Sequence, residues 1–265
     1  MPDVLLASGC SYTDPYFKSL DTSLPEEANG GWPMWPELLG KDLGLKVINS
    51  AESGLDNLSM HNRIVRDILN YGSDVKLVCI LWSGFDRFRF MNFKTIGLMN
   101  QLRMIQYPHH ANRKFSDIFS LTGLNDWLNN LVSHEHFPTK RVIINSFIDS
   151  FTYMNSIAEI CELKGIPYVF YQGVQPFNCN AYPFSENDVF GESLKDVLKS
   201  PMYSHTEKRK NNIIGWPLVT RCFDNEPARK NNDCLAVSNF DYHPNSEGQR
   251  LISEIFMKKY QELVK

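Results

Sequence analysis

Short apolar runs alternate with segments of helical periodicity along most of this chain, and this alternation constrains the fold more than any other feature. The clearest run is Val75–Trp82, bounded by polar residues and glycine. Four further runs also predict strands: Val4–Ser8, Lys46–Asn49, Tyr168–Tyr171 and Cys234–Val237. Strands that alternate with helices build a parallel sheet covered on both faces. The sequence therefore predicts an α/β fold with three layers, α/β/α, around a five-stranded parallel sheet.

The helical segments carry apolar residues at the spacing of one helix face. They are expected to begin near Pro33, after Asp56 as an N-cap, and at Pro244. Two stretches do not fit the simple alternation. Residues 88–135 have little strand pattern and are interpreted as a helical insertion, and residues 176–232 are rich in Asn, Pro, Ser and charge and predict an irregular loop excursion. We expect one domain over residues 1–265.

The composition excludes several classes of function. The chain of 265 residues has 27 Lys and Arg against 30 Asp and Glu, a formal charge of −3, with no basic run suited to nucleic acid. No segment reaches the roughly 20 apolar residues of a membrane span, and the N-terminus lacks the charged start of a signal peptide. We therefore expect a cytoplasmic protein without nucleic-acid or membrane partners.

Neither the cysteines nor the histidines predict a metal site. The 6 cysteines are scattered without a CxxC pair. The pairs His109-His110 and His134-Glu135-His136 cannot converge on one ion from a helix, and no third ligand is spaced to complete either. Gly9 lacks the glycine-rich context of a nucleotide site. We expect no metal and no cofactor.

Three residues at the carboxyl edge of the predicted sheet could carry chemistry, because ligands bind at that edge in such folds. Ser11 follows the first strand in Gly9-Cys10-Ser11, and Asp241 and His243 precede the last helix. A serine hydroxyl needs a base to become a nucleophile, and an imidazole base needs a carboxylate to hold its tautomer. Cys10 is a rival nucleophile, although a buried thiol is the simpler interpretation.

These blocks resemble those of the SGNH/GDSL hydrolases, a family of serine esterases and lipases with a flavodoxin-like fold. The Gly-Asp-Ser block is similar to Gly9-Cys10-Ser11, the block-two glycine to Gly54, and the final Asp-x-x-His block to Asp241-Tyr242-His243. The resemblance implies that Ser11 is the nucleophile, His243 the general base and Asp241 its partner. It also implies an oxyanion hole built from the backbone N–H groups of Ser11 and Gly54.

Two positions depart from the family pattern. The third oxyanion donor is an Asn in the family, but Asp86 stands there, and a carboxylate cannot donate a hydrogen bond. Asn57, at a helix start, is a candidate substitute for that donor as well as an ordinary helix-start residue. Asp241 lies two residues before His243 rather than three. Arg87, with Asp86, is a candidate for substrate binding or for a solvated ion pair.

The resemblance implies an esterase that removes a small acyl group, plausibly acetate, from a carbohydrate or another hydroxylated small molecule. The alternative is a catalytically degenerate protein that keeps the fold and serves as a binding or assembly module. Asp86 and the short Asp241-to-His243 spacing favour that alternative. A hydrolase would lose activity in both Ser11→Ala and His243→Ala, whereas rates that are unaffected by either change would remove the triad hypothesis.

Overall fold

The computed structural model describes residues 2–19, 21, 23–26, 29–85, 87–91, 99–103, 140–174, 189–216, 222–226, 235–238 and 241–265. Within them, five parallel strands form one sheet in the order β2-β1-β3-β6-β7. The strands are β1 (Val4–Gly9), β2 (Lys46–Asn49), β3 (Val75–Trp82), β6 (Tyr168–Gln172) and β7 (Ile213–Ile214). The predicted α/β fold with a five-stranded parallel sheet is confirmed.

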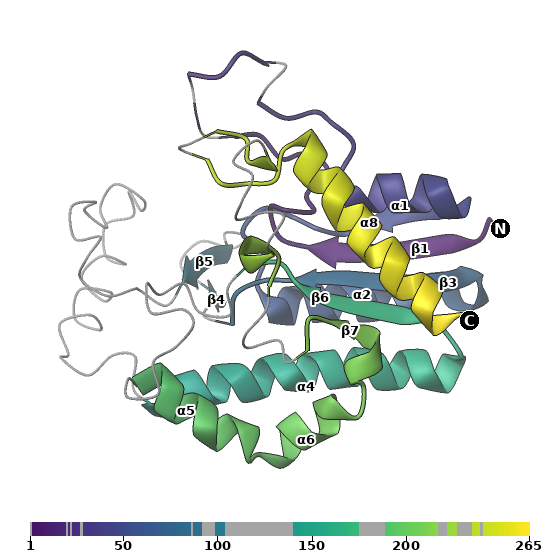
Figure 1. Ribbon diagram of the computed structural model, residues 1–265. Coiled ribbons are helices and arrows are strands. Elements are labelled where there is room, and N and C mark those ends of the chain that lie inside the picture. The colour runs from purple at the N-terminus through teal and green to yellow at the C-terminus, as the bar shows by residue number, and fades with distance from the viewer. Residues whose placement is uncertain are drawn as a thin grey trace.

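Helices cover both faces of the sheet and complete the three layers. Helices α1 (Trp35–Leu43) and α8 (Ser246–Leu263) pack together on one face, and α2 (Asn57–Tyr71) and α4 (Lys140–Lys164) pack together on the other. In Figure 1, α8 crosses in front of the strands, whereas α2 lies behind them. Helices α5 (Val189–Leu198) and α6 (Pro201–Glu207) lie against α4. No helix in the described ranges is long and apolar enough to cross a membrane.

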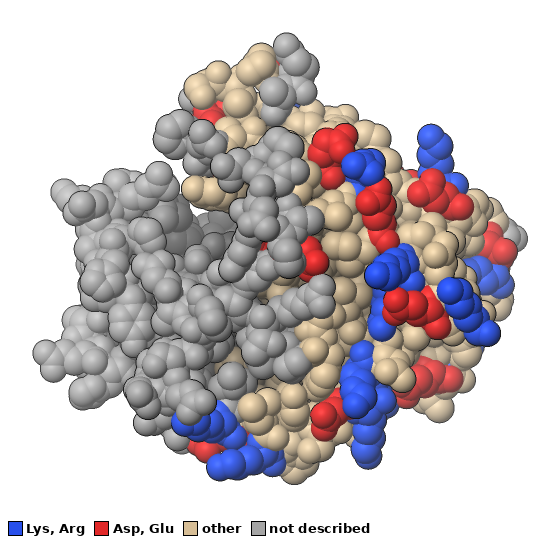
Figure 2. All heavy atoms as spheres, viewed as in Figure 1, with Lys and Arg blue, Asp and Glu red and all other residues tan. Residues whose placement is uncertain are grey.

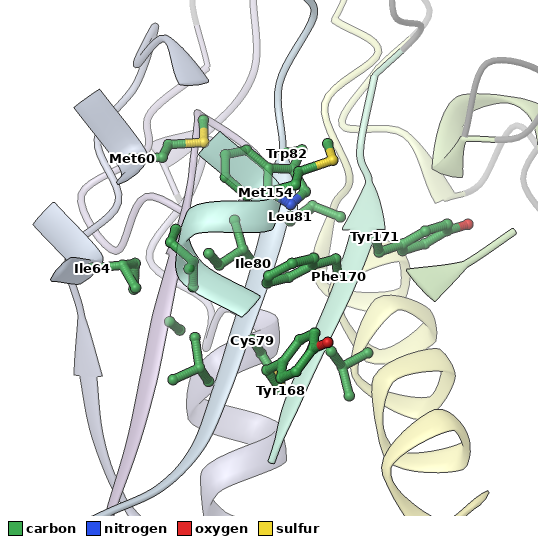
Figure 3. Packing of buried hydrophobic residues seen from close by; sticks show 14 of the residues in the cluster. Met60, Ile64, Cys79, Ile80, Leu81, Trp82, Met154, Tyr168, Phe170 and Tyr171 are labelled. Carbon is green, nitrogen blue, oxygen red and sulfur yellow. The ribbon is translucent and has the colours of Figure 1, made fainter. Parts of the chain in front are cut away.

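The core consists of side chains that leave the central strands toward both helical layers. Every residue of β1 and β6 is buried, as is every residue of β3 except Lys76. Phe170 meets the ring of Trp82 edge-on at 5.6 Å, while its neighbour Tyr171 packs against Phe256 of α8. Figure 3 shows Trp82, Phe170 and Tyr171 on their strands, together with the buried Met154 of α4. Because these strands are buried on both faces, their sequences are nearly unbroken runs of apolar residues.

The fifth strand differs from the prediction. The prediction of Cys234–Val237 is wrong, because Ala236 there forms only an isolated antiparallel bridge with Pro244. The fifth strand is Ile213–Ile214, paired with Phe170 and Tyr171 of β6. A strand of two residues gives too short a pattern to be read from sequence. The apolar residues 235–237 instead hold the loop that carries His243.

Two other segments also need correction. Residues 88–91 and 99–103 were expected to be helical, but β4 (Arg87–Met91) and β5 (Met99–Arg103) form an antiparallel pair. Arginine and apolar residues alternate along β4, which is a strand pattern. Residues 104–135 lie outside the described residues. The predicted excursion over residues 176–232 contains α5, α6 and β7, so its described part is largely regular structure.

The charged side chains of the described residues are interspersed on the face seen in Figure 2. Along α8, Arg250 pairs with both Glu247 and Glu254, and Lys259 pairs with Glu262 at 3.3 Å. Exposed pairs of this kind contribute little to stability, typically below about 1 kcal/mol each. The mixture follows from the near balance of acidic and basic residues in the sequence.

Candidate active site

A tight turn after β1 presents Ser11 at the carboxyl edge of the sheet. The turn closes where the Thr13 N–H donates to the Cys10 carbonyl at 2.8 Å. Gly9 is required there, because a Cβ at this position would lie 2.1 Å from the Thr13 hydroxyl oxygen. That hydroxyl oxygen accepts a hydrogen bond from the Trp35 indole at 3.0 Å. The turn is therefore fixed by its own backbone and by α1, and Ser11 is left 8% exposed.

A loop at the far end of the chain brings His243 and Asp241 to Ser11. His243 Nε2 lies 2.8 Å from Ser11 Oγ, and His243 Nδ1 lies 2.5 Å from Asp241 Oδ1. The loop is held at its base by the Val237 N–H, which donates to the His243 carbonyl at 2.9 Å. Asn245 then caps α8 through its side chain. An ionised carboxylate only accepts, so Nδ1 carries the proton and Nε2 accepts from the serine hydroxyl.

Two aromatic rings fix the plane of the His243 imidazole. The Tyr12 ring meets it edge-on at 5.3 Å, and the Phe17 ring lies against it at 4.6 Å with an interplanar angle of 35°. Tyr12 is itself anchored, since its hydroxyl donates to Asp224 Oδ1 at 2.9 Å. The imidazole is thus packed as well as hydrogen-bonded, which limits its rotation away from Ser11.

The Asp241 carboxylate is mostly buried and fully engaged. Its second oxygen, Oδ2, accepts a hydrogen bond from the Ser19 hydroxyl, while Oδ1 faces His243. Burial alone would raise the pKa of Asp241, but the hydrogen bonds from Ser19 and then His243 outweigh it and hold the pKa below its ordinary value. Asp241 is therefore the ionised partner that an imidazole base needs at neutral pH.

Gly54 lies in the loop after β2, close to the turn that carries Ser11. Gly54 adopts a positive φ of 79°, a conformation that favours glycine. The residue before it, Ser53, is bound to the Asp14 carboxylate through its N–H at 2.7 Å and its hydroxyl at 2.6 Å. Within the described residues, the N–H groups of Ser11 and Gly54 donate to no protein acceptor. Among the described residues, the protein itself therefore uses neither of these two N–H groups.

The amide of Asn57 is committed to the protein. Its Nδ2 donates to the Ser83 carbonyl at 3.3 Å and to the Ser150 hydroxyl at 3.2 Å, and its Oδ1 accepts from the Ser83 N–H at 3.0 Å. Asn57 therefore links α2, the end of β3 and α4, and has no N–H left for an oxyanion. Asp86 lies outside the described residues, and Arg87 is the first residue of β4.

Four further residues belong to the turn that carries Ser11 or to the loop that follows it. Cys10, the rival nucleophile, is completely buried. No prediction from the sequence covered the other three: Phe17 packs on His243, Ser19 donates to Asp241, and Asp14 binds Ser53 in the Gly54 loop. Asp14 directly follows the Gly-Cys-Ser-Tyr-Thr block, which is a weak signal. Phe17 and Ser19 lie in a polar loop whose conformation leaves no pattern in the sequence.

Neither a scan against protein-family models nor a search of curated proteins gives a match. Solved structures of esterases are similar to this chain. An esterase from Pseudoalteromonas sp. is 14% identical with a TM-score of 0.47, over 99% of this chain and 98% of that chain. A protein described as lipolytic and of the G-D-S-L family, from Desulfitobacterium hafniense, is 14% identical with a TM-score of 0.47, over 97% and 98%. A catalytic mutant of an acetylxylan esterase from Geobacillus stearothermophilus is 12% identical with a TM-score of 0.48, over 97% and 94%.

Proposed function

We propose that this protein is a serine hydrolase of ester bonds in which Ser11 is the nucleophile. The observation that carries the proposal is the unbroken hydrogen-bonded chain from Ser11 through His243 to Asp241. Three residues from opposite ends of the sequence meet with donor and acceptor roles that suit proton transfer. The resemblance of the sequence blocks to the SGNH/GDSL hydrolases supports the same assignment.

The reaction proceeds through an acyl-enzyme. Ser11 Oγ attacks the ester carbonyl carbon while His243 Nε2 takes the hydroxyl proton, and the carbonyl oxygen becomes an oxyanion. The N–H groups of Ser11 and Gly54 stabilise this oxyanion, and His243 then donates its proton to the departing alcohol oxygen. Water next attacks the acyl carbon with His243 as the base, and the carboxylic acid leaves as Ser11 regains its proton.

The substrate proposed is a carbohydrate, or a similar hydroxylated molecule, that carries a small acyl group such as acetate. The family resemblance suggests this class, and two exposed aromatic residues in the loops that carry Ser11 and His243 are consistent with it. Tyr242 lies between Asp241 and His243 and is 70% exposed, and Tyr16, in the Ser11 loop, is 89% exposed. Aromatic faces of this kind pack on the apolar faces of sugar rings.

Acetate release tests this proposal. The wild-type protein is incubated with p-nitrophenyl acetate and with acetylated xylo-oligosaccharides, and Ser11→Ala serves as the matched control. We expect hydrolysis of at least one ester by the wild type and a loss on the order of 10⁴-fold or more in the variant. Hydrolysis at equal rates in both proteins would contradict the assignment of Ser11.

A second candidate function is supported by one observation, the acidic residue Asp86 at the position of the family's third oxyanion donor. A degenerate member of the fold would bind an acylated carbohydrate in the same place without cleaving it. Calorimetric titration with the acetylated oligosaccharides separates the two candidates. Binding by the wild type without acetate release favours the binding module, whereas turnover excludes it.

A further inference from the structure

The hydrogen bonds of Asp241 differ between its two oxygens. Asp241 Oδ1 accepts from the backbone N–H of His243 at 3.1 Å as well as from Nδ1 of the ring. This double contact is a consequence of the short spacing, because an aspartate two residues before an amide readily closes such a local turn. Oδ1 therefore accepts both from the backbone of the loop and from the His243 ring. The orientation of the Asp241 carboxylate then depends on the group that holds Oδ2.

The other oxygen is held by Ser19, from a loop at the opposite end of the sequence. The Ser19 hydroxyl donates to Asp241 Oδ2, and both side chains are nearly buried, with exposures of 7% and 9%. The Ser19 oxygen itself accepts from the Asp21 N–H at 3.1 Å. An ionised carboxylate accepts only, so the single hydroxyl hydrogen of Ser19 lies on the bond to Asp241.

This bond is part of a closed ring that joins the two loops. Asp21 Oδ2 accepts from the Ser238 hydroxyl at 2.7 Å, and the Ser238 oxygen accepts from the Asp241 N–H at 3.1 Å. Starting from Asp241, the ring thus runs through Ser19, Asp21 and Ser238 and returns to the backbone of Asp241. Its members fix both the main chain and the side chain of Asp241.

The loop that carries Ser19 is closed at its base. The Ser19 N–H donates to the Asn29 carbonyl at 2.8 Å, and Lys18 forms an antiparallel bridge with Gly30. A Cβ at Gly30 would lie 2.4 Å from the Phe17 carbonyl oxygen, and Gly30 has a φ of 150°. Phe17 packs on the His243 ring. The backbone on both sides of Ser19 is therefore held by contacts with residues 29 and 30.

We propose that Ser19 is a positioning residue of the triad, which holds the Asp241 carboxylate in the orientation that the shortened spacing to His243 does not fix by itself. The inference rests on the proposed function for its catalytic consequence, but the contact itself is independent of any activity. With Ser19 in place, Oδ1 faces Nδ1, the proton stays on Nδ1, and Nε2 remains an acceptor for the Ser11 hydroxyl.

The test compares Ser19→Ala with the matched control Ser204→Ala in the whole chain of 265 residues. Ser204 is an exposed serine of α6, and within the described part of the chain it makes no hydrogen bond to Asp241 or to any member of the ring. Two quantities are measured: the NMR resonance of the His243 Nδ1 proton, and the rate at which a fluorophosphonate labels Ser11. In Ser19→Ala we expect the proton resonance to shift or disappear and labelling to slow by roughly 10- to 100-fold, the range for one hydrogen bond to a charged group. Ser204→Ala should match the wild type in both.

The outcomes separate this inference from the proposed function. Absence of labelling in the wild type would remove the proposed function, yet a proton resonance that changes in Ser19→Ala alone would still support the role of Ser19. A folded Ser19→Ala protein with an unchanged resonance and an unchanged labelling rate would overturn the inference about Ser19. Labelling of Ser11 in the wild type would still uphold the proposed hydrolase function in that case. Ser19→Cys keeps the side-chain shape with a weak donor. If Ser19→Ala does not fold, the same two readings on Ser19→Cys decide.

Discussion

The carboxylate of Asp14 binds Ser53, the residue immediately before Gly54, through both the Ser53 N–H at 2.7 Å and the Ser53 hydroxyl at 2.6 Å. Asp14 belongs to the loop after β1 that carries Ser11, whereas Ser53 belongs to the loop after β2. The other oxygen of the Asp14 carboxylate accepts a hydrogen bond from the Tyr16 N–H at 2.9 Å. This single side chain therefore ties together the two loops whose N–H groups form the proposed oxyanion hole.

Replacement of Asp14 should damage catalysis more than substrate binding. In Asp14→Ala the Gly54 N–H loses its fixed position relative to Ser11, and loss of one oxyanion donor costs roughly 10²- to 10³-fold in kcat. We expect a fall in kcat within that range with a KM close to that of the wild type, measured with p-nitrophenyl acetate. Asp42→Ala, an exposed change on α1, is the control. A folded Asp14→Ala protein with the wild-type kcat would show that the contact does not position the oxyanion hole.

Substitution of two adjacent residues at the end of β1 should have opposite effects on stability. Gly9→Ala places a methyl group against the Thr13 hydroxyl and near the Leu81 carbonyl, and overpacking of this kind costs about 1–3 kcal/mol. Ser8→Ala removes a buried hydroxyl that has no hydrogen-bond partner within the described structure. The free energy of unfolding of this variant should therefore equal or exceed that of the wild type. Thermal unfolding of both variants measures the difference. A Gly9→Ala protein as stable as Ser8→Ala would contradict the geometry of the Ser11 turn.

The ionisation of Asp241 should make stability depend on pH in the acid range. The pKa of Asp241 lies below its ordinary value because hydrogen bonds from Ser19 and His243 outweigh the effect of burial. An acid whose pKa is lower in the folded state stabilises the fold above its unfolded pKa, about 3.9, and this contribution is lost as the pH falls through the folded pKa. Asp241→Asn cannot titrate. At pH 6 the free energy of unfolding from urea titrations should therefore be higher for the wild type than for the variant. This difference should shrink toward pH 2.

The same variant tests the catalytic role of Asp241. An asparagine in place of the carboxylate favours the wrong imidazole tautomer, and the loss in a Ser-His-Asp triad is on the order of 10⁴-fold in kcat. We expect a decrease of that order in p-nitrophenyl acetate hydrolysis at pH 8. An Asp241→Asn protein with at least a tenth of the wild-type rate would mean that His243 does not need this carboxylate.

The central strands, and the residues that the structure brings together around His243, could be predicted from the sequence because each leaves a local signal. Val75–Trp82 is apolar throughout since β3 is buried on both faces, and Asp56 is found as the N-cap of α2 because its carboxylate accepts from the Ser59 N–H. Ser11 and His243 each follow or precede an element whose end is marked by glycine or proline. Parallel topology then places such ends at one edge of the sheet.

The remaining features depend on contacts between distant segments. Ile213–Ile214 is a strand only because β6 offers an edge beside it. Ser19 lies 222 positions from Asp241 in the sequence, and no periodicity or spacing connects them. Asn57 could be expected at a helix start, but its bonds to Ser83 and Ser150 emerge only once α2, β3 and α4 are packed together. Hydrogen bonds of this kind are properties of tertiary structure.

The most direct test of the central claim is covalent labelling of Ser11. The wild-type protein and His243→Ala are incubated with a fluorophosphonate, and intact mass and peptide mapping locate the adduct. We expect one adduct, on Ser11, that forms in the wild type and is absent or slower by several orders of magnitude in His243→Ala. A folded wild-type protein without an adduct on Ser11, or an adduct that forms equally fast without His243, would contradict the activation of Ser11 by this triad.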